Sequence, residues 1–261
     1  MGAFFPKESP TTVRGVAQLV EHRSPKPGVA GSSPAAPAII NFMKKLFNLS
    51  RNSDRAWLII WTLIFVNFLG LDAFFPNSIP VTLLKIAGIL LCVVYSFIKF
   101  RKDYYLIAAM FFTLVADVIL AANNVSVFGV GVFCLVQMTH AFRMSSIKPH
   151  VFNISVIAAI VVFAISMLLG QNPLYVMVGI YGLGLFFNVF QSGIWFFFKR
   201  TPASKCAFIG FLLFLACDLC VGVSFAANIG AFPSFLQGIM SFLAWGFYYP
   251  SQILISNSTT V

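Results

Sequence analysis

Charged residues are scarce in this sequence. They make up 9% of the 261 residues, whereas 59% of the residues are hydrophobic and Phe alone contributes 31. Soluble domains are about half apolar and about a quarter charged, so the composition excludes a water-soluble globular protein. The apolar residues come in blocks of about 20, the length of a helix that crosses a bilayer. Alternating strands are absent as well, so we expect an all-α, polytopic transmembrane helix bundle, an integral membrane protein.

The sequence also lacks the common motifs of cofactor and metal sites. It contains no H-E-x-x-H, G-x-S-x-G, P-loop or dinucleotide fingerprint, so we expect neither a cofactor nor a metal. The five cysteines lie in or beside apolar segments, where thiols are ordinary packing residues, and Cys217-x-x-Cys220 is interpreted in the same way. The net charge is +10, and most of the basic residues lie at span ends. This placement predicts contact with anionic lipid head groups and no nucleic-acid partner.

The first 42 residues are rich in proline and contain no apolar run long enough for a span or a signal peptide. Ala17–His22 resembles a translated tRNA D-arm, and Gly31–Pro34 resembles a TΨC arm in the same frame. Residues 1–42 are therefore interpreted as a translated tRNA gene upstream of a start at Met43, or else as a disordered tail. Residues 43–56 form a basic N-terminus, and residues 57–257 form the transmembrane domain.

Hydropathy predicts eight spans in this domain. Their approximate bounds are Trp57 to Leu71, Val81 to Phe100, Tyr104 to Ala122, Val125 to Met144, Val151 to Leu169, Leu174 to Phe198, Ala207 to Ala227 and Ser234 to Ser256.

Basic residues follow only the even-numbered spans. Lys and Arg occur before the first span and in the second, fourth and sixth loops, whereas the four odd-numbered loops contain none. The positive-inside rule therefore places both termini in the cytoplasm, and the expected location is the bacterial cytoplasmic membrane. Phe111–Asp117 can be laid over Leu212–Asp218, and a parallel 4+4 repeat is one interpretation of that match.

Four ionisable residues lie clearly inside the predicted spans, namely Lys85, Asp117, His140 and Asp218. Charges in a bilayer are costly, so each calls for a partner or a function. Asp117, Asp218 and Lys85 are expected at a similar depth, with His140 nearer the cytoplasmic side. Two interpretations stay open for the aspartates. They form structural ion pairs with Lys85 or hydrogen bonds between helices, or they act together as general acid and general base.

Several short patterns stand out along the predicted spans. They are Lys85 in the second span, Ala116-Asp117 in the third, Phe186-Phe187-Asn188 in the sixth, Gly210–Asp218 in the seventh and Tyr248–Ser256 in the eighth. In order and spacing these patterns resemble the lysoplasmalogenase family, also called YhhN-like. The sequence departs from the family at Ile86, Ala116 and Cys217, where the family has Pro, Gly and Ser. Either Gln137 or His140 stands at the family's histidine position. This member is therefore interpreted as divergent.

The resemblance implies a hydrolase that cleaves the vinyl ether bond of lysoplasmalogens into a fatty aldehyde and a glycerophospho-base. This chemistry needs a proton donor and a group that activates water, so Asp117 and Asp218 are the expected catalytic pair. The expected substrate-binding residues are Lys85, Gln137, His140, Asn188, Tyr249 and Gln252, and the expected partner is a membrane lipid substrate. The alternative is a non-catalytic lipid-binding or small-solute transport protein of the same fold.

Overall fold

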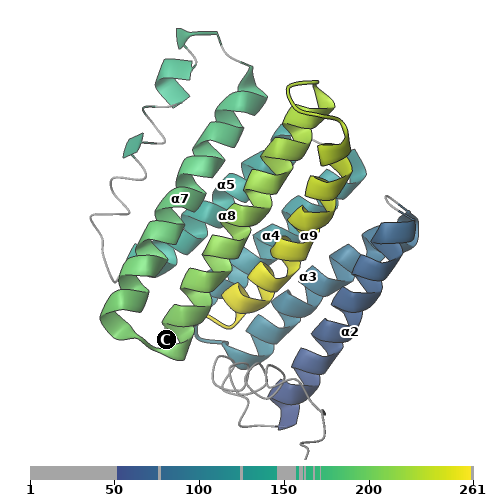
Figure 1. The fold of residues 1–261 in the computed structure, drawn as a ribbon. Coiled ribbons are helices and arrows are strands. Elements are labelled where there is room, and N and C mark those ends of the chain that lie inside the picture. Colours follow the sequence, from purple (N-terminus) through teal and green to yellow (C-terminus); the bar gives the residue numbers. More distant parts are fainter. Residues whose placement is uncertain are drawn as a thin grey trace, which may run out of the picture.

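A computed structural model describes residues 52–75, 78–123, 126–145, 157–158, 161, 163–166, 168–170 and 172–259. Residues 1–42 and most of 43–56, interpreted above from the sequence, lie outside this part of the chain. Within it there are seven long helices and no strands, as expected for an all-α bundle (Figure 1). The helices are α2 (Asn52–Phe74), α3 (Ile79–Lys99), α4 (Tyr104–Asn123), α5 (Val127–Ser145), α7 (Pro173–Lys199), α8 (Pro202–Asn228) and α9 (Phe235–Ser256).

Six of these helices, α2 to α5, α7 and α8, are long and apolar enough to cross a membrane. Helix α9 is not among these six, and it carries the polar residues Gln237, Ser241, Ser251 and Gln252. The predicted span Val151 to Leu169 lies largely outside the described residues, although those described between 157 and 168 are helical. The structure therefore supports a multi-pass helical membrane protein.

The observed helix bounds differ from the predicted ones most at the starts of α2 and α8, each of which begins five residues early, α2 at Asn52 instead of Trp57 and α8 at Pro202 instead of Ala207. Thr201 ends the preceding connection in an extended conformation, and its side-chain oxygen accepts a hydrogen bond from the Ser204 amide. Pro202 occupies the first turn, where its missing N–H costs nothing. Local capping therefore extends this helix beyond the apolar block that hydropathy detects.

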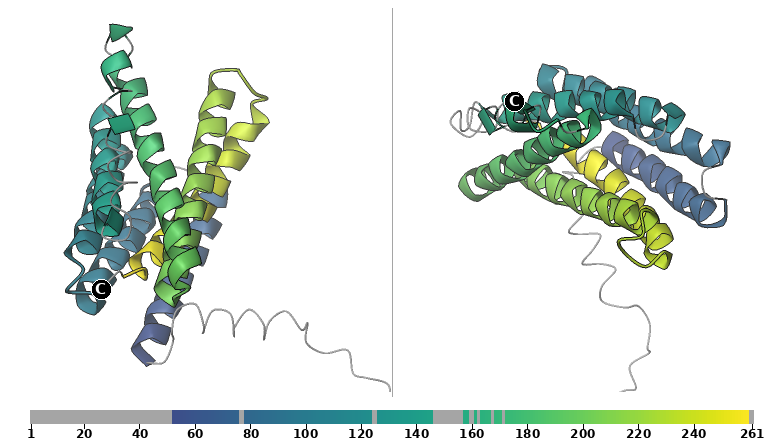
Figure 2. Two further views of the ribbon diagram at one scale, coloured as in Figure 1. Left: turned by 90° about the vertical axis from the view of Figure 1, so that its left-hand side faces the viewer. Right: turned by 90° about the horizontal axis from the view of Figure 1, so that it is seen from above.

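The helices pack in a ring. In chain order α3, α4, α5, α7, α8 and α9 each contact the next, and α9 closes the ring on α3. Helix α2 lies outside this ring against α3 and α9, and Figure 2 shows α9 between α8 and α2 when the bundle is seen from above. Large apolar side chains such as Phe97, Phe128 and Phe198 remain exposed on the outside, as expected for surfaces that face lipid.

One end of the bundle carries most of the basic residues that the structure describes. Figure 1 shows the start of α2, the connection between α7 and α8 and the C-terminal end of the chain together at its lower end. This basic end includes Lys99, Arg101, Lys102, Arg143, Lys199, Arg200 and Lys205. The described residues of the α2–α3 and α8–α9 connections, at the opposite end, contain no Lys or Arg.

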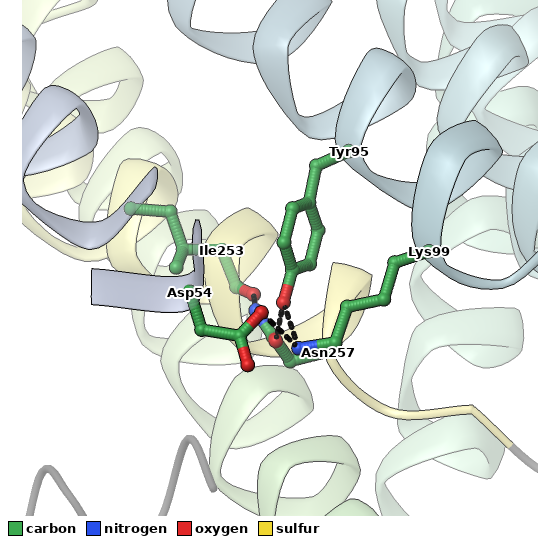
Figure 3. A network of polar contacts seen from close by, with 5 residues as sticks. All are labelled: Asp54, Tyr95, Lys99, Ile253 and Asn257. Atoms are coloured by element: carbon green, nitrogen blue, oxygen red, sulfur yellow. Dashed lines mark hydrogen bonds and ion pairs between the residues drawn. The ribbon is translucent and has the colours of Figure 1, made fainter. Parts of the chain in front are cut away.

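A polar network joins three helix ends at the basic end. Lys99 donates to Asp54 (2.9 Å) and to the hydroxyl of Tyr95 (2.6 Å), and Tyr95 donates to Asn257 (2.7 Å) (Figure 3). Nearby, Arg143 of α5 donates to the carbonyl and hydroxyl oxygens of Ser258, at 3.0 and 2.7 Å. These contacts bring the start of α2 and the ends of α3, α5 and α9 to the same end of the molecule.

Candidate active site at the centre of the helix ring

Asp117 and Tyr248 meet inside the ring. Asp117 lies 13 residues after the start of α4, which places it about 20 Å along the helix from the basic end. The Tyr248 hydroxyl donates to both carboxyl oxygens, at 2.9 Å for Oδ1 and 2.7 Å for Oδ2. Because α4 and α9 are not neighbours in the ring, this contact crosses its interior. Tyr248 is buried and Asp117 is partly buried.

Asp218 has an equivalent partner on another helix. The Tyr181 hydroxyl of α7 donates to Oδ2 of Asp218 on α8 at 2.6 Å. Both residues are partly buried. Each of the two predicted catalytic aspartates is therefore bound by a tyrosine hydroxyl, and each tyrosine comes from a different helix from its aspartate.

The two aspartate–tyrosine pairs lie close together around Phe214. The Phe214 ring contacts the Tyr248 ring at 5.6 Å and the Tyr181 ring at 6.4 Å between centroids. Asp117 and Asp218, which are expected at a similar depth, are therefore linked in the structure through the rings of Tyr248, Phe214 and Tyr181.

Lys85 lies beside this centre but does not pair with it. The ion pair considered above between Lys85 and Asp117 or Asp218 is not formed. Instead, Lys85 Nζ lies 3.2 Å from Oδ1 of Asp72, in the last turn of α2. The ammonium also sits over the Trp245 ring at 4.1 Å. Trp245 in turn contacts Tyr248 at 5.5 Å, so one aromatic ring separates Lys85 from the Asp117–Tyr248 pair.

Four further predicted residues are buried toward the basic end. Asn188 of α7 donates to the side-chain and backbone oxygens of Gln137 on α5, at 2.8 and 2.9 Å. His140 follows Gln137 by one turn and packs against the Phe211 ring at 5.1 Å. Gln252 is also buried, on α9. The structure thus separates these residues from the aspartates rather than placing all candidates in one cluster.

Tyr249 differs from its neighbour Tyr248. Its ring stacks on Phe65 at 5.2 Å, and its buried hydroxyl has no hydrogen-bond partner. Gly88 of α3 makes room for this ring, because a Cβ at that position would overlap it. The predicted substrate-binding tyrosine is therefore turned toward α2 and α3, away from the aspartates.

Three contributors to the site are not predicted from the sequence, namely Asp72, Tyr181 and Tyr248, because the prediction selects Tyr249 in place of its neighbour Tyr248. Asp72 lies just after the first predicted span, which ends at Leu71, although an acidic residue at the end of a span opposite a membrane lysine is a usable signal. Tyr181 gave no signal, because a tyrosine in an apolar helix resembles an ordinary core residue. Among the described residues, no group of three or more His, Cys, Asp or Glu side chains is arranged to hold a metal ion.

These features define a helical membrane protein with two tyrosine-bound aspartates at its centre. The chain belongs to the YhhN family, whose sequence pattern matches residues 81–259, more than half of its length. That range includes both aspartates and both of their tyrosine partners. No curated protein and no solved structure matches the chain.

Proposed function

We propose that the protein is a lysoplasmalogenase-like hydrolase that cleaves the vinyl ether bond of a lysolipid within the membrane. The observation that carries the proposal is the arrangement of Asp117 and Asp218, two carboxyl groups held by Tyr248 and Tyr181 on either side of Phe214. Membership of a family that includes lysoplasmalogenases supports the same activity.

Two carboxyl groups suit this reaction. One protonates the alkene carbon that is not bonded to oxygen, which leaves an oxocarbenium ion at the adjacent carbon. The other, as a carboxylate, takes a proton from a water molecule as the water attacks that ion. The resulting hemiacetal then breaks its bond to the glycerol oxygen, which receives a proton. The products are a fatty aldehyde and a glycerophospho-base, and water is the only co-reactant.

Lys85 is suited to bind the substrate's phosphate. Its ammonium lies near the end of the bundle opposite the basic end and contacts Asp72 and two aromatic rings, Phe68 at 5.3 Å and Trp245 at 4.1 Å. Tyr249 and Gln252 are proposed to contact the glycerol part, and Gln137, His140 and Asn188 to bind glycerol hydroxyls or water. A lysolipid would then place its head group near Lys85 and its vinyl ether near the aspartates.

The test is release of fatty aldehyde from a lysoplasmalogen by the purified full chain in lipid nanodiscs. Asp117→Asn and Asp218→Asn each remove a carboxyl group at constant size. We expect each to lower turnover by at least about 100-fold, the lower range for a lost general acid or base. Asn67→Ala is the control, because Asn67 is exposed and bonds only within its own helix, to the Leu63 carbonyl.

Unchanged turnover in either folded aspartate variant contradicts the two-carboxylate mechanism. If the folded wild-type protein releases no aldehyde from any of several lysolipids, that result contradicts the proposed hydrolase function. In that case the remaining candidate is lipid binding or small-solute transport, which solute uptake by proteoliposomes would detect.

We also propose eight spans with both termini in the cytoplasm of a bacterial membrane. Helix α5 ends at the basic end, where Arg143 contacts Ser258. Helix α7 ends there too, at Lys199, after 27 residues, so it begins about 40 Å away at the opposite end. The connection between these helices must therefore run the length of the bundle, which supports a span there. The basic end is the side that the positive-inside rule places in the cytoplasm.

A further inference from the structure

Four uncharged polar side chains form a cluster between α5 and α7, nearer the basic end than the aspartates. Gln137 and His140 come from α5, and Asn188 and Gln191 come from α7. All four are buried, with exposed fractions of 1%, 1%, 0% and 3%. Such groups are costly in an apolar interior unless each finds a hydrogen-bond partner.

The register of the two helices aligns these residues in two facing pairs. Helices α5 and α7 both end at the basic end, so they run in the same direction. Asn188 bonds directly to Gln137, which sets the register. His140 and Gln191 each follow by three residues, so they occupy the same faces one turn further on. The four residues are defined here as the α5–α7 polar cluster.

Most hydrogen-bonding capacity in this cluster is unused. Both polar atoms of the Gln191 amide lack a partner, as do Gln137 Nε2, Asn188 Oδ1 and His140 Nδ1. These atoms include donors, the two amide nitrogens, and acceptors, the two amide oxygens. A ligand that satisfies them must therefore both donate and accept hydrogen bonds, which a simple cation or anion does not.

The packing of the helices favours a very small ligand. A Cβ on Gly184 would lie 2.8 Å from Gln137 Cβ, so the two helices approach closely beside the cluster. The unpartnered atoms are themselves inaccessible from the outside. Water is small, uncharged and both donor and acceptor, and buried water typically bonds to two to four polar groups.

We propose that the α5–α7 polar cluster binds ordered water molecules inside the membrane domain. The cluster lies between the basic end, marked by Arg143 one turn after His140, and the Asp218–Tyr181 pair. Phe133, one turn before Gln137, contacts Tyr181 at 5.7 Å. We assign this water as the source of the molecule that attacks the oxocarbenium ion, and this role rests on the proposed hydrolase function.

Hydroxyl-radical labelling by X-ray radiolysis tests water binding without any reference to activity. Bound water generates radicals in place, so buried side chains beside it become oxidised. We expect oxidation of Phe211, which is fully buried and lies against His140. Gln191→Met replaces the amide, with its two unpartnered atoms, by an apolar side chain of similar size. This variant should lower the oxidation of Phe211 several-fold. Leu185→Met, a matched change at a fully buried position of the same helix, should leave it unchanged.

Absence of Phe211 oxidation in wild-type protein overturns the proposed water site, whether or not any variant folds. Turnover of a lysoplasmalogen tests the assigned role. Gln191→Met should lower kcat by about tenfold and leave KM within twofold. Oxidation that falls in Gln191→Met while kcat stays unchanged overturns the supply role. If Phe211 of the wild-type protein is oxidised but no lysoplasmalogen is hydrolysed, the result contradicts the proposed hydrolase function and supports the water site.

Discussion

Tyr248 and Tyr181 are the residues whose hydroxyl groups orient the candidate catalytic carboxyls. Replacing either by Phe removes the hydroxyl that donates to a carboxyl group and keeps the ring packing; Tyr248 donates to both oxygens of Asp117, at 2.9 and 2.7 Å, and Tyr181 to one oxygen of Asp218, at 2.6 Å. A bond of this kind contributes about 1.5 kcal/mol or more, so we expect kcat for vinyl ether hydrolysis to fall about tenfold in each variant. Tyr175→Phe, at an exposed position, is the control. Equal kcat in wild type and Tyr248→Phe would show that Asp117 does not depend on this bond.

At the residue scale, the sequence predicts where charged residues lie in the membrane better than it predicts which residues contact them. Asp117 and Asp218 can be predicted because an ionised group is rare in a 20-residue apolar block. The tyrosine partner of Asp117 cannot be predicted, because Tyr248 and Tyr249 are adjacent and chemically identical. Which of them faces Asp117 depends on the rotation of α9 against α8 and α3. That rotation follows from packing such as the Tyr249 ring over Gly88, which a single sequence does not specify.

At the scale of elements, helices α8 and α9 pack closely at a glycine. A Cβ on Gly210 would lie 2.8 Å from Ile255 Cγ1 and 3.1 Å from the Ile255 backbone nitrogen. Gly210→Ala therefore forces the helices apart. The cost of overpacking exceeds the gain in helix propensity, so we expect a net loss of about 1 to 2 kcal/mol. Thermal unfolding in detergent would show it as a lower melting temperature.

Gly222→Ala is the matched control on the same helix. No atom lies within 4 Å of a Cβ at Gly222, so this substitution should leave the melting temperature unchanged or raise it. A Gly210→Ala variant as stable as Gly222→Ala would mean that α8 and α9 do not approach as closely as described.

Helix ranges were predictable from hydropathy because an apolar block must be long enough to cross the bilayer. The predicted Tyr104 to Ala122 and observed Tyr104–Asn123 agree within one residue. Hydropathy carries no information on which helices touch. The pairing of Asp72 with Lys85 depends on the short α2–α3 connection, which turns the end of one helix against the start of the next.

At the scale of the whole molecule, charge is distributed unevenly between the two ends of the ring. The basic end is held together by the Lys99–Asp54 ion pair (Figure 3). It is also held by the hydrogen bond from Arg143 to the Ser258 hydroxyl. The aspartate centre lies closer to the opposite end, beside Lys85. A lysolipid whose phosphate contacts Lys85 would therefore come from the leaflet facing away from the basic residues.

This orientation can be measured by cysteine labelling on intact cells with a membrane-impermeant maleimide. In a background without the five native cysteines, we expect Phe232→Cys, in the α8–α9 connection, to be labelled without permeabilisation. Leu169→Cys, just before α7, should behave in the same way if the segment preceding α7 crosses the membrane. Lys102→Cys, between α3 and α4, should react only after permeabilisation.

Labelling of Lys102→Cys alone on intact cells would reverse the proposed orientation. Labelling of Phe232→Cys without Leu169→Cys would contradict eight spans, because these two positions would then lie on opposite sides.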